Sequence, residues 1–396
     1  MKVCILTPRF PMPEAGGDLL RINNIARYLK SRGHQLVLVS YTETNPDFKL
    51  AGAIYDKIYT IKRSKWDSFF YSAISLLKRT PIQCGYYYSR RFLKLFRQVI
   101  KEEAPDLYVT HLIRMVPFVD KAGVSQSTIV EMTDALSKTY ILATGAKGSW
   151  LKRFMYSIEK HLIGEYELDI IRRFPKVVLV SQSDIDYLND KLGAPSSSLA
   201  MHTNGVDLAP TVRKDYDCHK ICFIGNMISL QNQDAVIYFA DEVFPKILEA
   251  KPDTHFYIVG NNPPKSVQKL ASRPNITVTG FVDDLQAFVS DSCLAVASIR
   301  IAAGIQNKVL VAMACQIPVV ITSLIAAPIP ELKDGINCFI CEDADAMARR
   351  CIMLMNDKQL RSDIAANGYD MVKKHYAWSA KLNGYEDMKP NCQATK

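Results

Sequence analysis

The residues best suited to chemistry lie in the stretch SIRIAAGIQNKVLVAMACQIPVVITS, residues 298–323. Arg300 follows an apolar run and Gly304 marks a turn. Lys308 falls in the first turn of a helix predicted over 305–315. The first N–H groups of a helix have no partner within the helix, so they can bind an anion. Together with a nearby guanidinium and ammonium, such a helix start favours binding of a diphosphate. The alternative is an ordinary strand-to-helix loop with solvated charges.

A second candidate site is predicted near the N-terminus. PRFPMPEAGGDLLR joins a first predicted strand to a first predicted helix. Gly16 and Gly17 in this loop have no side chains, so the backbone there can come close to another group. Bare N–H groups at the start of the following helix favour an anion. A simple turn is the alternative interpretation of the two glycines.

Two titratable residues follow later strands of the same series. His111 ends DLYVTH, with Arg114 three residues on, and Asp134 ends STIVEMTD. An imidazole and a carboxylate at adjacent strand ends can bind hydroxyls or move protons. A structural role is the alternative for the histidine.

The elements that must position these residues alternate between apolar strands and helical patterns. This alternation restarts after a linker near 206–218, which predicts an α/β protein of two Rossmann-like domains with parallel sheets facing a central cleft. The expected domains are 1–205 and 218–376, followed by a C-terminal helix at about 377–390. A length of 396 residues suits two domains.

The composition excludes several classes of protein. A hydrophobic fraction of 48% and a charged fraction of 22% are typical of soluble globular chains, and no run of 18 apolar residues occurs. The first apolar run is too short for a signal peptide, so a cytoplasmic protein is expected. The ten cysteines are scattered and several lie in apolar runs, which predicts small buried side chains and no metal site.

The net charge of +9 is concentrated in residues 51–100. This basic segment has ten Lys and Arg, two acids and eleven aromatic residues. Tyrosine and tryptophan favour membrane interfaces and cations favour anionic lipids, so we expect contact with an anionic membrane surface. A solvated face over core aromatics is the alternative. Nucleic acid is not expected, because no recognised binding module accompanies the charge.

At 303–322 the chain resembles the GT-B glycosyltransferases, specifically the retaining, nucleotide-sugar-dependent family 4 (glycosyl transferases group 1). AGIQNKVLVAMACQIPVVIT looks like the donor-binding segment of that family and is nearest the bacterial exopolysaccharide-associated sugar transferases. LVSQSDIDYL, NGVDL and FIGNM are similar to further landmarks of the family, so the resemblance covers almost the whole chain.

The resemblance implies roles for particular residues. It implies an acceptor held mainly by the N-terminal domain, a donor held mainly by the C-terminal domain, and a C-terminal helix that crosses back to the first domain. No cofactor and no metal are implied, and a nucleotide-diphosphate sugar is the substrate. The implied residues fall into three groups: His111 and Asp134 as catalytic; Gly16, Gly17, Arg300, Gly304, Ile305, Gln306, Lys308, Val311 and Glu331 as donor-binding; and Asp18 and Arg114 as acceptor-binding.

The chain departs from the family pattern at two acidic positions and one basic pair. The family commonly has two glutamates eight residues apart, and these positions hold Ala303 and Val311 here. The second glutamate normally accepts hydrogen bonds from the ribose hydroxyls, which valine cannot do. Asn226, Gln231 and Asn232 occupy the segment where a basic pair is often found. These departures predict weak donor binding or another residue that holds the ribose.

The function implied is sugar transfer from a nucleotide-diphosphate sugar to a hydroxyl of a lipid-linked or growing surface polysaccharide, such as lipopolysaccharide O-antigen, capsule or exopolysaccharide. Retention of configuration is inferred from the family alone. The expected location is cytoplasmic, peripheral on the inner face of a bacterial cytoplasmic membrane. The alternatives are a non-catalytic GT-B-like partner in a glycan-assembly complex and a GT-B-fold nucleotide-sugar epimerase.

Overall fold

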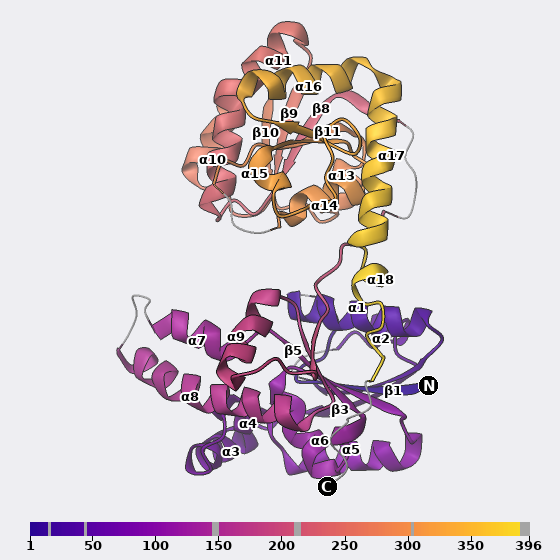
Figure 1. Ribbon diagram of the computed structural model, residues 1–396, viewed down its shortest axis with the longest axis vertical. Coiled ribbons are helices and arrows are strands. Elements are labelled where there is room, and N and C mark those ends of the chain that lie inside the picture. Colours follow the sequence, from indigo (N-terminus) through magenta and orange to yellow (C-terminus); the bar gives the residue numbers. More distant parts are fainter. Residues whose placement is uncertain (15–16, 43–45, 145–149, 210–214, 302–304, 389–396) are drawn as a thin grey trace. The chain divides into compact units, whose positions relative to one another are not determined.

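The computed structural model divides the chain into two compact units. Unit 1 comprises residues 1–204 and 382–396, and unit 2 comprises residues 205–381. The structure describes the chain except for residues 15–16, 43–45, 145–149, 210–214, 302–304 and 389–396, and except for the side chains over 142–158. Figure 1 shows a sheet flanked by helices in each unit.

The sheet of unit 1 has seven parallel strands in the order β3-β2-β1-β4-β5-β6-β7. The strands are β1 (Lys2–Thr7), β2 (Gln35–Thr42), β3 (Lys57–Lys62), β4 (Leu107–His111), β5 (Thr128–Thr133), β6 (Lys176–Leu179) and β7 (Leu199–Met201). The order reverses between β1 and β4, so the chain leaves these two strands in opposite directions along the sheet. Ligands bind at such a point beyond the carboxyl ends of the strands.

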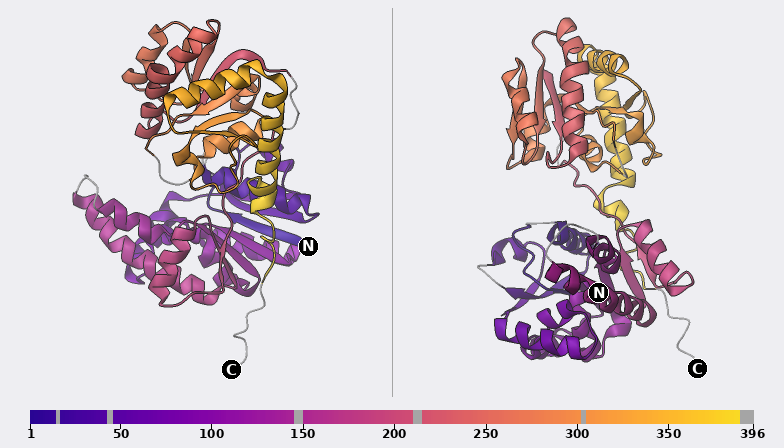
Figure 2. Two further views of the ribbon diagram at one scale, coloured as in Figure 1. Left: turned by 45° about the horizontal axis from the view of Figure 1, so that its top comes forward. Right: turned by 90° about the vertical axis from the view of Figure 1, so that its left-hand side faces the viewer.

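Helices cover both faces of this sheet (Figure 2). They are α1 (Gly17–Ser31), α2 (Phe48–Gly52), α3 (Lys65–Leu77), α4 (Ile82–Tyr87), α5 (Arg90–Glu103), α6 (Val116–Ala122), α7 (Leu136–Thr144), α8 (Trp150–Arg173) and α9 (Gln182–Leu192), with short 3₁₀ turns at Ile113–Met115 and Ser125–Ser127. The core strands are continuous apolar runs because both faces of the sheet are buried, as in β1, where Val3 to Leu6 are fully buried.

The sheet of unit 2 has six parallel strands in the order β10-β9-β8-β11-β12-β13. The strands are β8 (Asp217–Ile224), β9 (His255–Val259), β10 (Ile276–Gly280), β11 (Ser292–Ala297), β12 (Val319–Thr322) and β13 (Phe339–Cys341). The two parallel sheets confirm the predicted pair of Rossmann-like folds. The short strands β7 and β13 were not predicted, because three residues are too few to show a period.

The helices of unit 2 lie on both sides of its sheet in the right-hand view of Figure 2. They are α10 (Leu230–Tyr238), α11 (Phe244–Ala250), α12 (Lys265–Gln268), α13 (Leu285–Val289), α14 (Asn307–Ala314), α15 (Ser323–Ala326), α16 (Ala344–Asn356), α17 (Lys358–His375) and α18 (Trp378–Lys381), with a 3₁₀ turn at Lys269–Ser272. A π turn at Phe239–Val243 lies between α10 and α11. It precedes Pro245, which has no N–H to donate into a regular helix.

The helix expected at about 377–390 is much shorter than predicted. Among the described residues of this range only α18 is helical, and the following residues 382–388, which include turns at 382–386, belong to unit 1. The carbonyl oxygens of Gly384, Tyr385 and Asp387 accept hydrogen bonds from Lys176 Nζ at 2.8, 2.8 and 3.1 Å. Because these carbonyls point to one ammonium, they cannot also serve a regular helix.

All nine cysteines in the described part of the chain are free thiols, and eight of them are buried. Burial raises the pKa of the Cys222 thiol to about 12, so this side chain is a neutral, small apolar group. The predicted packing role of Cys4, Cys222, Cys293 and Cys315 is therefore confirmed. Among the described residues, no helix is long and apolar enough to cross a bilayer.

Candidate functional site

The predicted residues of unit 1 meet at the carboxyl edge of its sheet. His111 is the last residue of β4, Asp134 directly follows β5, and Gly17 begins α1 after β1. Gly16 lies outside the described residues. Leu112 and Thr133 have φ of +68° and +72°, in the left-handed region that residues with a side chain rarely adopt. Such strained backbone is held in place by its surroundings and gathers at functional sites.

His111 is fully buried, and neither of its ring nitrogens has a hydrogen-bond partner in the described structure. Burial lowers the pKa of His111 to about 3, and nearby guanidinium groups, including that of Arg21, act in the same direction. The imidazole is therefore neutral at physiological pH. A buried ring with an unused acceptor and an unused donor can bind a hydroxyl group.

Asp18 and Arg114 lie near this histidine and already have partners. Arg9 Nη2 donates to both oxygens of Asp18 at 2.5 and 2.6 Å. Partial desolvation opposes ionisation, but Arg9 and the other contacts outweigh it and lower the pKa of Asp18. Arg114 Nε donates to Gln83 Oε1 at 2.8 Å. Both side chains are thus held in fixed orientations beside His111.

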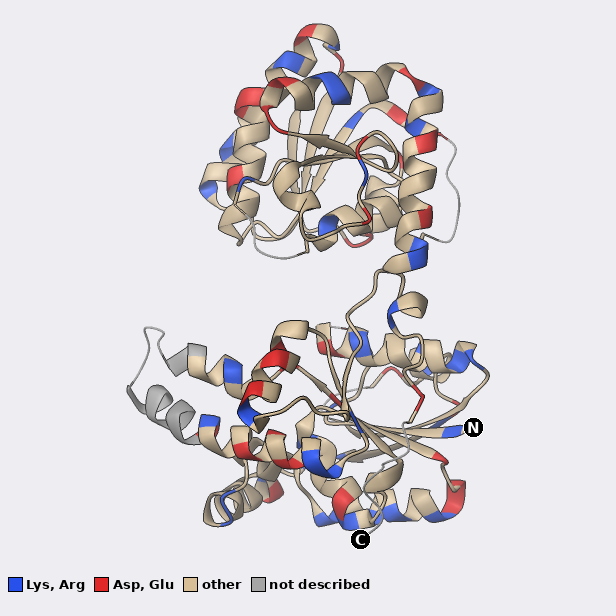
Figure 3. Cartoon of the chain, in the orientation of Figure 1, with Lys and Arg blue, Asp and Glu red and all other residues tan. Residues whose placement is uncertain are grey.

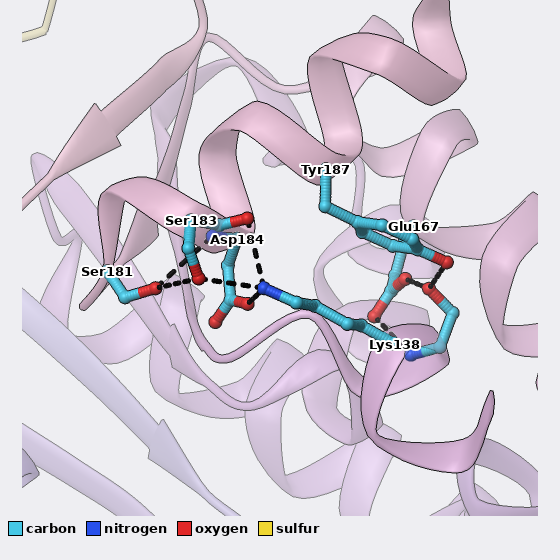
Figure 4. A network of polar contacts seen from close by, with 7 residues as sticks. Lys138, Glu167, Ser181, Ser183, Asp184 and Tyr187 are labelled. Atoms are coloured by element: carbon cyan, nitrogen blue, oxygen red, sulfur yellow. Dashed lines mark hydrogen bonds and ion pairs between the residues drawn. The ribbon is translucent and has the colours of Figure 1, made fainter. Parts of the chain in front are cut away.

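The carboxylate of Asp134 is more exposed than its neighbours. Desolvation and the nearby carboxylate of Asp184 raise its pKa. Figure 4 shows that Lys138 reaches from α7 to the start of α9. There Lys138 Nζ contacts Asp184 Oδ1 at 2.8 Å and Ser183 Oγ at 2.7 Å. This contact fixes α7, the helix that begins two residues after Asp134.

A second part of the same close-up is a buried acid. Glu167 Oε2 accepts a hydrogen bond of 2.5 Å from Ser137 Oγ, which also lies 3.2 Å from the Tyr187 hydroxyl (Figure 4). Burial raises the pKa of Glu167 to about 7. These contacts join α7, α8 and α9, so they help to fix the helix that begins two residues after Asp134.

Sequence reasoning missed the buried ion pair behind the site. Arg21 Nε contacts Glu131 Oε1 at 2.9 Å, and Arg21 Nη2 also donates to the His202 carbonyl at 2.8 Å. The Tyr385 hydroxyl donates to Glu131 Oε2 at 3.0 Å. A glutamate inside the apolar run STIVEM was the available signal, because an acid in a buried strand needs a partner.

In unit 2, Arg300 and Lys308 both reach α10. Arg300 Nε and Nη2 contact Asp234 at 3.1 and 2.5 Å, and the guanidinium lies 4.4 Å from the centroid of the Tyr238 ring. Lys308 Nζ donates to Asn232 Oδ1 at 2.5 Å. Asp234 and Tyr238 are four residues apart and therefore lie on one face of α10, where Arg300 reaches both.

Lys308 occupies the first turn of α14, as predicted. Its ammonium also donates to Gln306 Oε1 at 3.1 Å, and no carboxylate of the described residues lies within ion-pair distance of it. Burial lowers the pKa of Lys308 to about 8. The Val309 N–H donates to the Gln306 carbonyl at 3.0 Å, while no side chain caps the start of α14. The N–H groups of Asn307 and Lys308 are therefore the ones that could bind an anion. Gly304 lies outside the described residues.

The remaining predicted donor residues occupy different surroundings. Ile305 is exposed, while Val311 is half-buried and packs against the core of unit 2. The Glu331 carboxylate accepts a hydrogen bond of 2.6 Å from the Tyr376 hydroxyl, beside His375 at 3.9 Å. These contacts outweigh desolvation and lower the pKa of Glu331. Glu331 is therefore tied to the end of α17, and Arg300 and Lys308 are tied to α10.

Close backbone packing holds the loop beside Lys308. A Cβ on Gly260 would lie 1.7 Å from the carbonyl oxygen of Gly225, so only glycine fits after β9. The side-chain nitrogen of Asn232 donates a hydrogen bond of 2.8 Å to the carbonyl oxygen of Asn226, and the side-chain oxygen of Asn232 accepts one from Lys308. The amides that replace the expected basic pair thus orient the lysine. Groups of three or more metal-ligating side chains are not found in the described part of the chain.

Comparison with known proteins agrees with the fold. Residues 218–357 match the family model of the glycosyl transferases group 1. An uncharacterized 44.6 kDa protein in the cps region of Klebsiella pneumoniae is 21% identical over 389 residues, which cover 95% of this chain and 96% of that protein.

Two similar solved structures extend over nearly the whole chain. Alr3699/HepE of Anabaena, solved in complex with UDP, has a TM-score of 0.58 at 14% identity, covering 97% of this chain and 98% of that one. WaaG, a glycosyltransferase involved in lipopolysaccharide biosynthesis, has a TM-score of 0.53 at 12% identity, covering 98% and 100%. The class that the fold and the family match define is that of the GT-B glycosyltransferases. The chain has the GT-B fold, and the match of its residues 218–357 to the glycosyl transferases group 1 model agrees with the resemblance seen in the sequence.

Proposed function

We propose that this protein transfers a sugar from a nucleotide-diphosphate sugar to a hydroxyl of a lipid-linked or growing surface polysaccharide, with retention of configuration. The observation that carries the proposal is Lys308, a partly desolvated ammonium without a carboxylate partner at the uncapped start of α14. The UDP complex of HepE and the cps-region relative support the donor class and the biological setting.

The leaving nucleoside diphosphate gains negative charge as the glycosidic bond breaks. Lys308 and the first N–H groups of α14 stabilise that charge in the transition state. Arg300 contributes by exchanging Asp234 for a phosphate oxygen, since an exposed ion pair stabilises by only about 0–1 kcal/mol. Positive side chains and a helix start take the place of a metal ion, so the proposed reaction requires none.

On the acceptor side, neutral His111 binds a hydroxyl of the transferred sugar or of the acceptor, and Asp134 takes part in proton movement. Asp18 and Arg114 orient the acceptor, and Gly17 lies beside the donor phosphates. We propose a peripheral location on the inner face of the cytoplasmic membrane, reached through the basic aromatic segment 51–100.

Binding of free nucleotides to the full chain tests the proposal. Thermal-shift screening against UDP, GDP, ADP, CMP and their sugars should show stabilisation by one diphosphate nucleotide, and Lys308→Gln should remove it. The substitution Lys220→Gln is a matched control, because Lys220 is held by Asp291 and the Phe288 carbonyl. No stabilisation by any nucleotide at millimolar concentration would favour the second candidate, a non-catalytic GT-B-like partner. Val311, where the family has a ribose-binding glutamate, is the observation that favours it.

A further inference from the structure

A cavity of about 450 Å³ in unit 1 lies outside the residues assigned above. Its volume falls within the roughly 300–1,000 Å³ of small-molecule sites. It is open to solvent and is lined by α3, α4, α6, α8 and the start of α5, elements that Figure 1 shows together at one side of the unit. The apolar part of its wall consists of Tyr71, Ile74, Cys84, Tyr88, Pro117 and Tyr166.

The cavity is a built part of the fold. A Cβ on Gly85 would lie 2.4 Å from the carbonyl oxygen of Tyr71, so glycine allows α4 to pack directly against α3. The Glu159 carboxylate accepts hydrogen bonds from the N–H groups of Ile82 and Gln83 at 3.1 and 3.3 Å. Tyr71 and Tyr88 meet edge to face at 4.8 Å. These contacts hold the wall of the cavity in place.

Three cations line the same cavity. Lys78, Arg90 and Lys121 are exposed, and no carboxylate of the described residues forms an ion pair with any of them. The single acid in the wall, Asp120, is already bound to Arg173 Nη1 at 2.7 Å and Ser125 Oγ at 2.9 Å. The cavity therefore combines an apolar interior with uncompensated positive charge, which is complementary to an anionic amphiphile.

The outer face of α3 gives the direction from which such a ligand arrives. Trp66, Phe69 and Leu77 are 84%, 77% and 86% exposed, and their spacing places them on one side of the helix. The other side, with Tyr71 and Ile74, forms the cavity wall. Figure 3 shows α3 almost entirely free of charge, while cations follow it in the chain. A helix with exposed aromatic residues and nearby cations is typical of a membrane interface.

We propose that this cavity binds one anionic membrane lipid, with its phosphate between Lys78, Arg90 and Lys121 and part of an apolar chain against Tyr71, Ile74 and Tyr166. The site holds the lipid as a single molecule, beyond the general attraction of a basic surface to a bilayer. The inference rests on the proposed function only through the membrane contact of segment 51–100, and it requires neither a donor nor sugar transfer.

Titration calorimetry of the full chain with monomeric dihexanoyl phosphatidylglycerol tests the site. We expect saturable binding that weakens by about tenfold or more in Ile74→Trp, which fills the cavity, and in Lys78→Gln/Arg90→Gln, which removes charge. Lys94→Gln, a cation on α5 outside the cavity, should bind like the wild type. The double charge variant changes only exposed residues, so it keeps the test valid if the tryptophan variant does not fold.

Two further measurements separate this inference from its alternatives. Inorganic phosphate and dihexanoyl phosphatidylcholine should each bind at least about tenfold more weakly, and equal binding of phosphate alone would show a plain anion site. Leu77→Gln should leave monomer binding unchanged and reduce sedimentation with phosphatidylglycerol vesicles. Absence of monomer binding, or self-association through the α3 face in ultracentrifugation, overturns the proposal. Nucleotide stabilisation stays intact in either case, so the two proposals fail separately.

Discussion

At the scale of single residues, Lys308 links the site to a measurable pH dependence. Its pKa of about 8 means that the ammonium is mostly charged at pH 7 and mostly neutral at pH 9. If the charged form binds the diphosphate, nucleotide affinity should fall by about tenfold between these pH values. Lys308→Arg should remove most of this dependence, because a guanidinium stays protonated. Calorimetry across this range checks the prediction, and an affinity that is flat up to pH 9 in the wild type contradicts it.

Val311 allows a gain of function to be predicted. Val311→Glu should tighten nucleotide binding by about tenfold or more, since a charged acceptor for a ribose hydroxyl contributes about 1.5–3 kcal/mol. Glutamine is similar in size to glutamate but carries no charge, so Val311→Gln controls for altered packing against the core of unit 2. Calorimetry with the nucleotide identified by screening measures the change. Equal affinity of the two variants and the wild type would mean that the ribose lies elsewhere.

At the scale of elements, the Arg21–Glu131 pair joins α1 to β5 behind His111 and Asp134. Arg21→Met alone leaves Glu131 buried without its cation, which should destabilise unit 1 by about 3–5 kcal/mol. The double variant Arg21→Met/Glu131→Leu should recover most of that loss, because it removes both charges. Urea unfolding followed by circular dichroism measures both. A double variant as unstable as the single one would show that the contacts to His202 and Tyr385 matter more than the charges.

The elements also show how far the sequence predicts the structure. Both parallel sheets followed from apolar runs alternating with helical patterns, and His111 and Asp134 were correctly placed at strand ends. Partners on other elements could not be predicted from spacing along the chain, as with Asp234 for Arg300 and Tyr376 for Glu331. The predicted length of the C-terminal helix was wrong, because the carbonyl groups of its second half bind the ammonium of Lys176, which lies on the distant strand β6.

At the scale of the whole molecule, the tail, residues 382–388, belongs to unit 1, although the chain passes from unit 1 into unit 2 after residue 204. A truncation after Lys381 removes the three carbonyl acceptors of Lys176 and the buried Tyr385. Loss of these contacts should cost unit 1 about 3 kcal/mol or more, which corresponds to roughly 6–12 °C in Tm. Hydrogen–deuterium exchange reports each unit separately, and unit 2 should be unchanged. A truncation after Met388 is the control, and equal effects of the two truncations contradict the prediction.

Because the tail returns to unit 1, two stretches of chain connect the units, near residue 204 and near residue 382. Unit 2 is in this sense an insertion within unit 1. A protease cut near residue 204 gives two polypeptides, which the contacts of the tail with Lys176 and Glu131 still hold together. A chimera that takes its donor half from a relative consequently needs two splice junctions. An end-to-end fusion would leave the recipient without the tyrosine and carbonyl groups that bind Glu131 and Lys176 of its own sheet.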